Sequence, residues 1–204
     1  RNCRFINSQQ AGTSKENTMH GILARACQYM SIHDNYSQGM QYKLAGPGAG
    51  GLDLQCYGNR MIDCTQFAIS YVSTADLSVM ARADIFDNII RCAATAGSGA
   101  IYVGTDTTDG TRTLDVTDIA IHHNIITGEV DDNGEFIKVF YGVGTNRNIK
   151  VDDNIITRIS SVGGNNFGIV VGSRATTGVQ TLQGLSVSRN LIYDCNFWAI
   201  SLQS

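Results

Sequence analysis

The chain has little charge imbalance, one proline and no long apolar run, and these absences narrow what it can do. Its 204 residues include 15 Lys plus Arg against 18 Asp plus Glu, a formal charge of −3. It therefore lacks the basic surplus of a general nucleic-acid-binding domain. No apolar run approaches the roughly 18 residues of a membrane-spanning helix, and no basic-then-apolar signal peptide opens the chain. We expect no nucleic-acid partner and no membrane insertion.

The six cysteines are scattered without a C-x-x-C pair and without histidines at zinc-ligand spacing. Cys56 and Cys195 fall in or beside apolar stretches, where a free thiol behaves as a small hydrophobic group. We expect buried thiols rather than disulfides, and no metal site. Reduced thiols suit assembly in the cytosol, even for a protein that acts outside cells.

What the chain does contain is one repeated word: two alternating apolar residues, two variable residues, an asparagine and a second apolar pair. It is clearest at Ile119–Ile126, Ile149–Ile156 and Leu185–Ile192. The successive asparagines are 24, 29, 36, 30 and 36 residues apart. A unit of this size cannot bury its own apolar face and must stack on its neighbours. The six copies centre on Asn35, Asn59, Asn88, Asn124, Asn154 and Asn190.

Each repeat predicts three short strands: one before the asparagine, one directly after it, and one after a variable loop. The third strands include Gly99–Val103, Phe136–Val139 and Gly168–Val171. Ile and Val at alternate positions are a strand signature, and the residues that turns favour lie between these segments. No amphipathic helix of ten or more residues is predicted.

With this organisation the chain resembles the right-handed parallel β-helix, the pectate-lyase-like architecture of polysaccharide lyases, glycoside hydrolases and phage tailspikes. In that superfamily, whose count of strands starts at the strand after the variable loop, an asparagine at the tight bend between the second and third strands forms an internal ladder, and the six asparagines match that position. Asn tolerates the left-handed backbone of a sharp bend, and its amide can hydrogen-bond the Asn one coil away. We predict an all-β, right-handed parallel β-helix of about six to seven coils with three strands per coil.

A leucine-rich repeat is the rival interpretation, because its repeated word is similar. Repeats of 36 residues exceed the usual 20–29 of that class. Ile and Val also replace leucine, and a strand is predicted where that class can place a helix. These differences favour the β-helix.

We expect a single domain over residues 1–204. The chain begins at Arg1 rather than at Met, Ile200–Leu202 stops within a predicted strand, and no capping helix is visible. Exposed β-helix ends would template aggregation. We therefore expect a fragment of a longer chain that lacks its caps.

The variable loops carry nearly all the extra length of the longer repeats, and long loops on a rigid scaffold are where function concentrates. In the resemblance, the loops on either side of the third strand flank its outer face and form a groove. The loops are predicted at residues 104–118, 127–135, 157–167 and 172–184.

One of these loops holds four carboxylates within seven residues, from Glu129 to Glu135. Paired carboxylates could serve as acid and base or nucleophile in glycosidic cleavage, so Asp131, Asp132 and Glu135 are the candidate catalytic residues. They could instead bind Ca²⁺, which takes hard oxygen ligands. A solvated acidic turn around Asn133–Gly134 is the simpler alternative. No other cofactor is expected.

Outward positions of the third strands supply the candidate sugar-binding residues Tyr102, Lys138 and Trp198. Aromatic faces stack on sugar rings, and a lysine can hold the carboxylate of an acidic sugar. Asp106 and Asp109 lie in the loop that follows Tyr102 and are added to this set. Alternatively, these aromatic residues cover the core at the edge of a coil.

The residues before the asparagines form a second row of alternating charge: Asp87, His123, Asp153 and Arg189. Stacked one coil apart, they predict a surface ion-pair ladder of small energetic worth. A catalytic His–Asp pair is the alternative.

The chain departs from named members of the superfamily. It has no Gly-His-Gly of the polygalacturonases and, with Pro47 as its single proline, no Arg-x-Pro-x-x-Arg of the pectate lyases. Our hypothesis is a phage tailspike-type protein, on the virion tail or extracellular, that binds and cleaves a bacterial surface polysaccharide. The resemblance implies a homotrimer. A non-catalytic structural or adhesive shaft and a secreted polysaccharide lyase or epimerase remain alternatives, because fold alone does not determine function.

Overall fold

A computed structural model of the chain shows strands joined by turns, and no helix, in the residues it describes. Accordingly, no helix that could cross a membrane is found in this part of the chain. The described residues are 3–6, 20–23, 28–39, 42–45, 51–64, 67–73, 78–93, 99–105, 114–129, 134–160, 166–173, 180–195 and 198–203.

The strands form three parallel sheets, which we name A, B and C. Sheet A contains the strands that follow the asparagines: β1 (Arg4–Ile6), β4 (Tyr36–Gln38), β7 (Arg60–Cys64), β10 (Ile89–Cys92), β13 (Ile125–Glu129), β16 (Ile155–Ser160) and β19 (Leu191–Cys195). Sheet B contains β2 (His20–Leu23), β5 (Tyr42–Ala45), β8 (Ile69–Ser73), β11 (Gly99–Thr105), β14 (Glu135–Tyr141), β17 (Phe167–Ser173) and β20 (Trp198–Gln203). Sheet C contains the strands that precede the asparagines: β3 (Gln28–His33), β6 (Gly51–Tyr57), β9 (Ser78–Phe86), β12 (Leu114–His122), β15 (Gly144–Asp152) and β18 (Gln180–Ser188).

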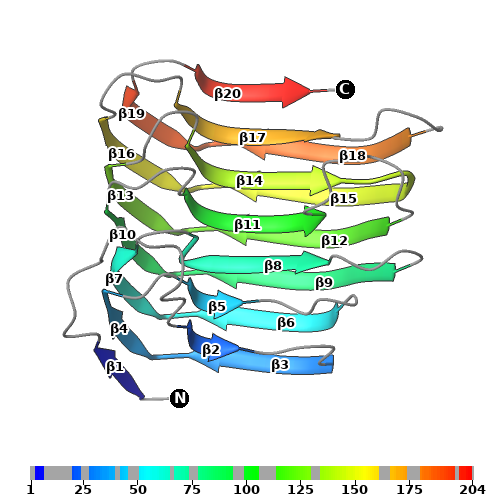
Figure 1. Cartoon of the computed structure of the whole chain (residues 1–204). Helices are drawn as coiled ribbons and strands as arrows, with labels where there is room; N and C mark the ends of the chain where they lie inside the picture. Colours follow the sequence, from blue (N-terminus) through cyan, green and yellow to red (C-terminus); the bar gives the residue numbers. More distant parts are fainter. Residues whose placement is uncertain are drawn as a thin grey trace.

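The chain visits sheets C, A and B in turn, and each strand pairs in parallel with the strand one visit earlier and one visit later. Sheets B and C face one another, and sheet A closes one side between them (Figure 1). The predicted all-β parallel solenoid with three strands per coil is confirmed. The leucine-rich repeat is excluded for the described residues, because a strand occupies every position where its helix would lie.

The core consists of columns of like residues that rise through successive coils. Ile69, Ile101, Ile137 and Ile169 are register partners in sheet B, and all four are fully buried. Cys56 occupies the same kind of column in sheet C, below Ile85. Such stacking buries each apolar face against its own copy, as the repeat predicted.

The prediction of buried free thiols is confirmed for three of the cysteines. Cys56, Cys64 and Cys92 are buried and unoxidised, whereas Cys3 is exposed and Cys195 partly exposed. Burial raises the pKa of the Cys56 thiol to about 12, because a thiolate is poorly solvated in an apolar core. Cys27 lies outside the described residues.

The six asparagines form a continuous ladder at the bend between sheets C and A. From Asn35 to Asn190, each side-chain Nδ2 donates to the Oδ1 of the next asparagine at 3.0 Å. The same Oδ1 also accepts from the preceding asparagine's backbone N–H at 3.0–3.1 Å. Asn88, Asn124 and Asn154 are fully buried, so these bonds satisfy groups that water cannot reach.

A single ladder amide holds three coils together. Asn124 donates forward to Asn154 and backward to the carbonyl of Ile85 at 2.9 Å, while its oxygen accepts from Asn88. The backbone adds a parallel set, in which Ile125 N–H donates to the carbonyl of Asn88 at 2.9 Å. Every donor and acceptor of the Asn124 amide is therefore in use.

The left-handed residue of this bend is not the asparagine, as predicted, but the residue before it. Asp87, His123, Asp153 and Arg189 have φ between 52° and 56°, and Asp34 and Gly58 occupy the same position in earlier coils. The asparagine needs an ordinary backbone so that its amide points inward along the ladder. The preceding residue makes the reversal, at a conformational cost for a side chain other than glycine.

The strands extend further into the predicted loops than the repeat indicated. β12 begins at Leu114, β13 reaches Glu129, β16 reaches Ser160 and β18 begins at Gln180, so the predicted loop bounds were too wide. The added segments alternate in the manner of a strand, with Leu114 and Val116 buried. Asp115 and Thr117 alternate with these apolar residues, but Asp and Thr are also common in turns, so the segment was assigned to a loop.

Replacing Asn124 with alanine should destabilise the fold by roughly 3 kcal/mol or more, because several buried groups would lose their partners and each costs about 1–3 kcal/mol. Urea unfolding of purified protein measures the change. Asn148→Gly is the matched control: Asn148 is exposed, has a φ of 54° that glycine accepts, and makes one surface bond to Asp118. That variant should stay within about 1 kcal/mol of the parent. Equal losses in both variants would contradict a structural role for the ladder.

Candidate functional site on the outer face of sheet C

A second left-handed column runs through the middle of sheet C. Its members have φ between 54° and 70°, one in each strand, and the register skips each of them. Each left-handed residue lies opposite the left-handed residue of the next strand, so the register on either side of the column stays in phase. The column consists of Tyr29, Asp53, Arg82, Asp118, Asn148 and Gly184.

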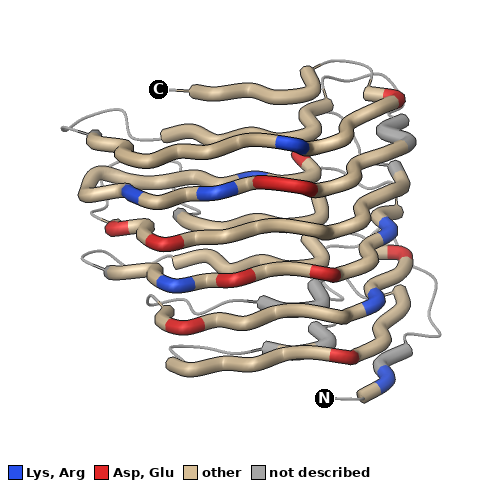
Figure 2. The backbone as a smooth tube through the Cα atoms, turned by 180° about the vertical axis from the view of Figure 1, so that it is seen from behind, with Lys and Arg blue, Asp and Glu red and all other residues tan. Residues whose placement is uncertain are grey.

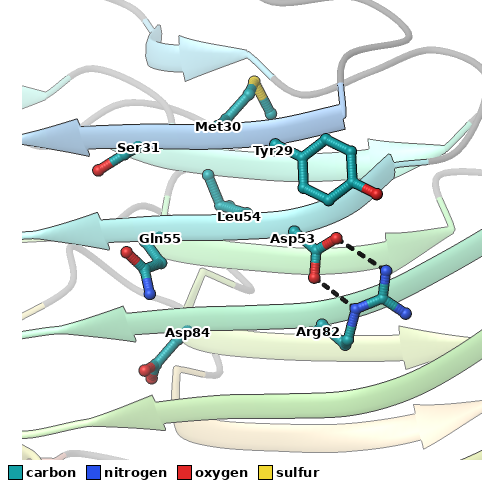
Figure 3. Close-up of a pocket in the computed structure, with 8 residues that line it drawn as sticks. All are labelled: Tyr29, Met30, Ser31, Asp53, Leu54, Gln55, Arg82 and Asp84. Carbon is teal, nitrogen blue, oxygen red and sulfur yellow. Dashed lines mark hydrogen bonds and ion pairs between the residues drawn. The ribbon is translucent and has the colours of Figure 1, made fainter.

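Two columns of polar side chains run across the first three strands of sheet C, on either side of apolar residues that point into the core. One column is Tyr29, Asp53 and Arg82, and the other is Ser31, Gln55 and Asp84. Met30 and Leu54 lie between them, as Figure 3 shows. Together these eight residues line a hollow of about 460 Å³ on the outer face of the solenoid.

Tyr29 is the most distinctive member of this set. Its side chain is 76% exposed although it is large and largely apolar. It also has a φ of 58°, a conformation that bulky residues rarely adopt and that is enriched at functional sites.

Beside Tyr29, the Arg82 guanidinium holds both oxygens of Asp53. Arg82 Nη2 donates to Asp53 Oδ2 at 2.8 Å, and Nε donates to Oδ1. These bonds lower the pKa of Asp53 below its ordinary value of 3.8, because they favour its charged form. The pKa of Arg82 is raised chiefly by the same bonds and further by the charges of Asp53 and Asp118. Asp53 and Arg82 therefore form a fixed, mutually neutralised pair.

Asp84 lies on the other side of the hollow, and a histidine of the next strand, β12, holds its carboxylate. His122 Nε2 donates to Asp84 Oδ1 at 2.9 Å, and the Nδ1 atoms of His122 and His123 lie 2.8 Å apart. The His122 ring completes a column of stacked rings with His33, Tyr57 and Phe86, whose centroids are 4.7–5.2 Å apart and whose planes lie within 7°. The stack fixes His122, and His122 fixes the Asp84 carboxylate.

The wider face carries charges of both signs, seen from its outer side in Figure 2. Asp118 and Asn148 continue the left-handed column and are bonded at 2.7 Å. Lys150 stands two coils beyond Asp84 in the same column, which places it about 10 Å away at the spacing of parallel strands.

The predicted sugar-binding residues Tyr102 and Lys138 are brought together in sheet B, but they are enclosed. Tyr102 is 4% exposed and Lys138 6%. The Lys138 ammonium lies 4.7–5.8 Å from the ring centroids of Phe67, Tyr102 and Phe140. Both oxygens of Glu135 accept hydrogen bonds from Lys138 at 3.0 Å. This cluster matches the alternative interpretation, in which aromatic residues cover the core.

The remaining predicted site residues are separated from that cluster or lie outside the described part. Trp198 is 53% exposed at the start of β20. Asp131 and Asp132, in the connection between β13 and β14, and Asp106 and Asp109, after β11, are outside the described residues. In the described part of the chain, no three His, Cys, Asp or Glu side chains are grouped as metal ligands would be.

The predicted ion-pair row at the bend is confirmed for Asp153 and Arg189. Arg189 donates to both carboxylate oxygens of Asp153 at 2.7 and 2.8 Å, and these bonds lower the pKa of Asp153. His123 bonds to His122 instead of forming the proposed catalytic pair with Asp153.

Sequence reasoning missed the residues of the hollow. Asp53 and Arg82 stand at outward positions of the alternating segments Leu52–Cys56 and Ala81–Ile85, and that alternation was the available signal, because it places polar side chains on one face in successive repeats. The site prediction was confined to the long loops and to the third strands, whereas these residues lie on strands that precede the asparagines.

Comparison with protein-family models, curated proteins and solved structures finds no match to this chain. The resemblance to the pectate-lyase-like β-helices therefore rests on the repeat and on the parallel solenoid itself.

Replacing Lys138 with methionine should destabilise the protein by roughly 3–5 kcal/mol, because Glu135 would be left as an unpaired buried charge. The double variant Lys138→Met, Glu135→Leu should recover most of that loss. Chemical denaturation measures both, with Lys150→Met as the control, since Lys150 is an exposed lysine of sheet C. A Lys138→Met protein as stable as the control would show that the pair is dispensable for folding and would reopen a binding role for Lys138.

Proposed function

We propose that this protein binds a bacterial surface polysaccharide, in the manner of tailspike-type β-helices, along the hollow of sheet C. The observation that supports the proposal best is the exposed Tyr29 ring beside carboxylate, guanidinium and amide groups on a rigid sheet. An aromatic face packs against the apolar side of a sugar ring, and a few fixed polar groups then orient its hydroxyls.

The direction of the hollow also suits a linear polymer. Its two polar columns run from β3 to β6 to β9, along the solenoid axis (Figure 3). Equivalent side chains recur about every 4.8 Å along that direction. A chain molecule lying between the columns would meet polar groups at each coil.

Polysaccharide cleavage is a separate proposal at a second place on the molecule, because its candidate catalytic residues Asp131, Asp132 and Glu135 belong to the connection before β14 and to β14 of sheet B, not to the hollow of sheet C. Glu135 needs separate treatment because its carboxylate holds Lys138, so replacing it changes stability as well as chemistry. The informative variant is therefore Asp131→Asn, Asp132→Asn with Glu135 intact. It should abolish the release of new reducing ends or unsaturated products from a polysaccharide that the parent cleaves. Unchanged turnover would remove both aspartates from the mechanism.

Binding is tested with Tyr29→Asn, which removes the ring but keeps a residue tolerant of a left-handed backbone. Affinity for purified capsular and O-antigen polysaccharides should fall about tenfold, or ~1.4 kcal/mol, as expected for the loss of one aromatic contact. Isothermal titration calorimetry on the parent and the variant gives both numbers.

Tyr193→Asn is the matched control, because Tyr193 is a comparably exposed tyrosine (48%) on sheet A. It should bind as the parent does. No binding by the parent to any polysaccharide of the panel would count against the proposed function and favour the non-catalytic shaft.

The tailspike resemblance also leads us to propose a homotrimer, located on a virion tail or outside cells. Sedimentation-velocity experiments on the purified chain should give about three times the mass of one 22.0 kDa chain. Sedimentation as a monomer at all concentrations would contradict this assembly.

A further inference from the structure

We infer that the hollow of sheet C selects neutral and amine-bearing sugars and rejects sugars that carry carboxylates. This inference rests on the proposed function, since it names the class of polysaccharide that the same site would bind. It concerns Asp84 above all.

The charges around the hollow leave a negative surplus. Of its lining residues, Asp53 and Asp84 are acidic and Arg82 is basic. Arg82 is committed to Asp53 through two hydrogen bonds, so the positive charge is already neutralised. Asp118, in the next position of the left-handed column, adds a further negative charge close enough to act on Arg82.

Positive groups outside the hollow do not reverse this balance. Lys150 stands two coils from Asp84, about 10 Å away, which is about one Debye length at physiological ionic strength. Lys138, which the sequence offered as a partner for an acidic sugar, belongs to sheet B and is neutralised by Glu135. A uronate or sialate in the hollow would therefore meet the carboxylates of Asp53 and Asp84, while Arg82 is committed to Asp53 and His122 to Asp84.

Asp84 provides the attraction for the sugars that the hollow selects. Its side chain is 42% exposed, and its Oδ1 is fixed by His122. An ionised carboxylate only accepts hydrogen bonds, and its bonds to donors are stronger than those between neutral groups. Sugar hydroxyls, and above all a protonated sugar amine, are such donors, and Gln55 beside Asp84 can pair with either hydroxyl or N-acetyl groups.

The test measures binding of the purified chain to three defined probes: dextran (neutral), glucosamine oligosaccharides from chitosan (amine-bearing) and polygalacturonate (carboxylate-bearing). The parent should bind the neutral or amine-bearing probe at least tenfold more tightly than polygalacturonate. Asp84→Asn keeps an oxygen for His122 but removes the charge, so it should weaken glucosamine binding about tenfold and narrow the discrimination against polygalacturonate.

Asp87→Asn is the matched control. Asp87 follows the same strand, β9, and undergoes the same change of charge, but it lies at the bend outside the hollow, with a left-handed φ of 54° that asparagine tolerates. Its binding profile should equal that of the parent.

The outcomes distinguish a failure of the charge selection from a failure of polysaccharide binding itself. Tighter binding of polygalacturonate than of the other probes would overturn the charge selection while leaving polysaccharide binding intact. Preference for neutral or amine-bearing probes with equal effects of the Asp84 and Asp87 changes would overturn the role of Asp84. Binding of none of these probes or of the bacterial polysaccharides would sink the proposed function and this inference with it.

Discussion

The asparagine ladder is the interaction on which the rest of the structure depends. A bend between two sheets turns the backbone away from both sheet ladders, so its N–H and C=O groups need other partners. Each ladder amide supplies them across three coils, and bonds of this kind polarise one another when they run in one direction. The ladder therefore fixes the register of the coils at the corner, and the apolar columns of the core follow from that register.

Register also accounts for the surface of sheet C. Because every coil is held at the same level by its asparagine, the left-handed residues of sheet C fall into one column, as do the rings from His33 to His122. A hollow lined by consecutive residues of each polar column exists only because neighbouring coils keep the same register. The candidate site is thus a property of the stack rather than of any single repeat.

The repeat was sufficient to predict the parallel solenoid, the three strands of each coil and the ladder positions. Periodicity carries that information because each inward side chain must meet its own copy. The left-handed residue was misassigned by one position, since both Asn and the residues before it, such as Asp87 and His123, are compatible with a bend. The hollow was missed for a different reason: Asp53 and Arg82 alternate with apolar neighbours as any outward strand residue does, and the order of residues does not reveal that the two pair across coils.

Lys138 illustrates a limit of reading faces from alternation alone. Its position on the outer face of sheet B was deduced correctly, but an outward side chain is solvent-accessible only where nothing covers the face. Three aromatic rings and Glu135 surround its ammonium. Whether a face is open depends on contacts between side chains from different coils, which the order of residues along the chain does not reveal.

The unequal spacing of the asparagines, between 24 and 36 residues, has a consequence for how such a molecule can change. The ladder bonds keep nearly the same lengths across the shortest and the longest interval, so the difference is absorbed elsewhere in the coil. Insertions or deletions in the peripheral loops of one coil can then accumulate without displacing the coils on either side of it. A solenoid built in this way can change its surface loops one coil at a time while the three sheets and the ladder stay unchanged.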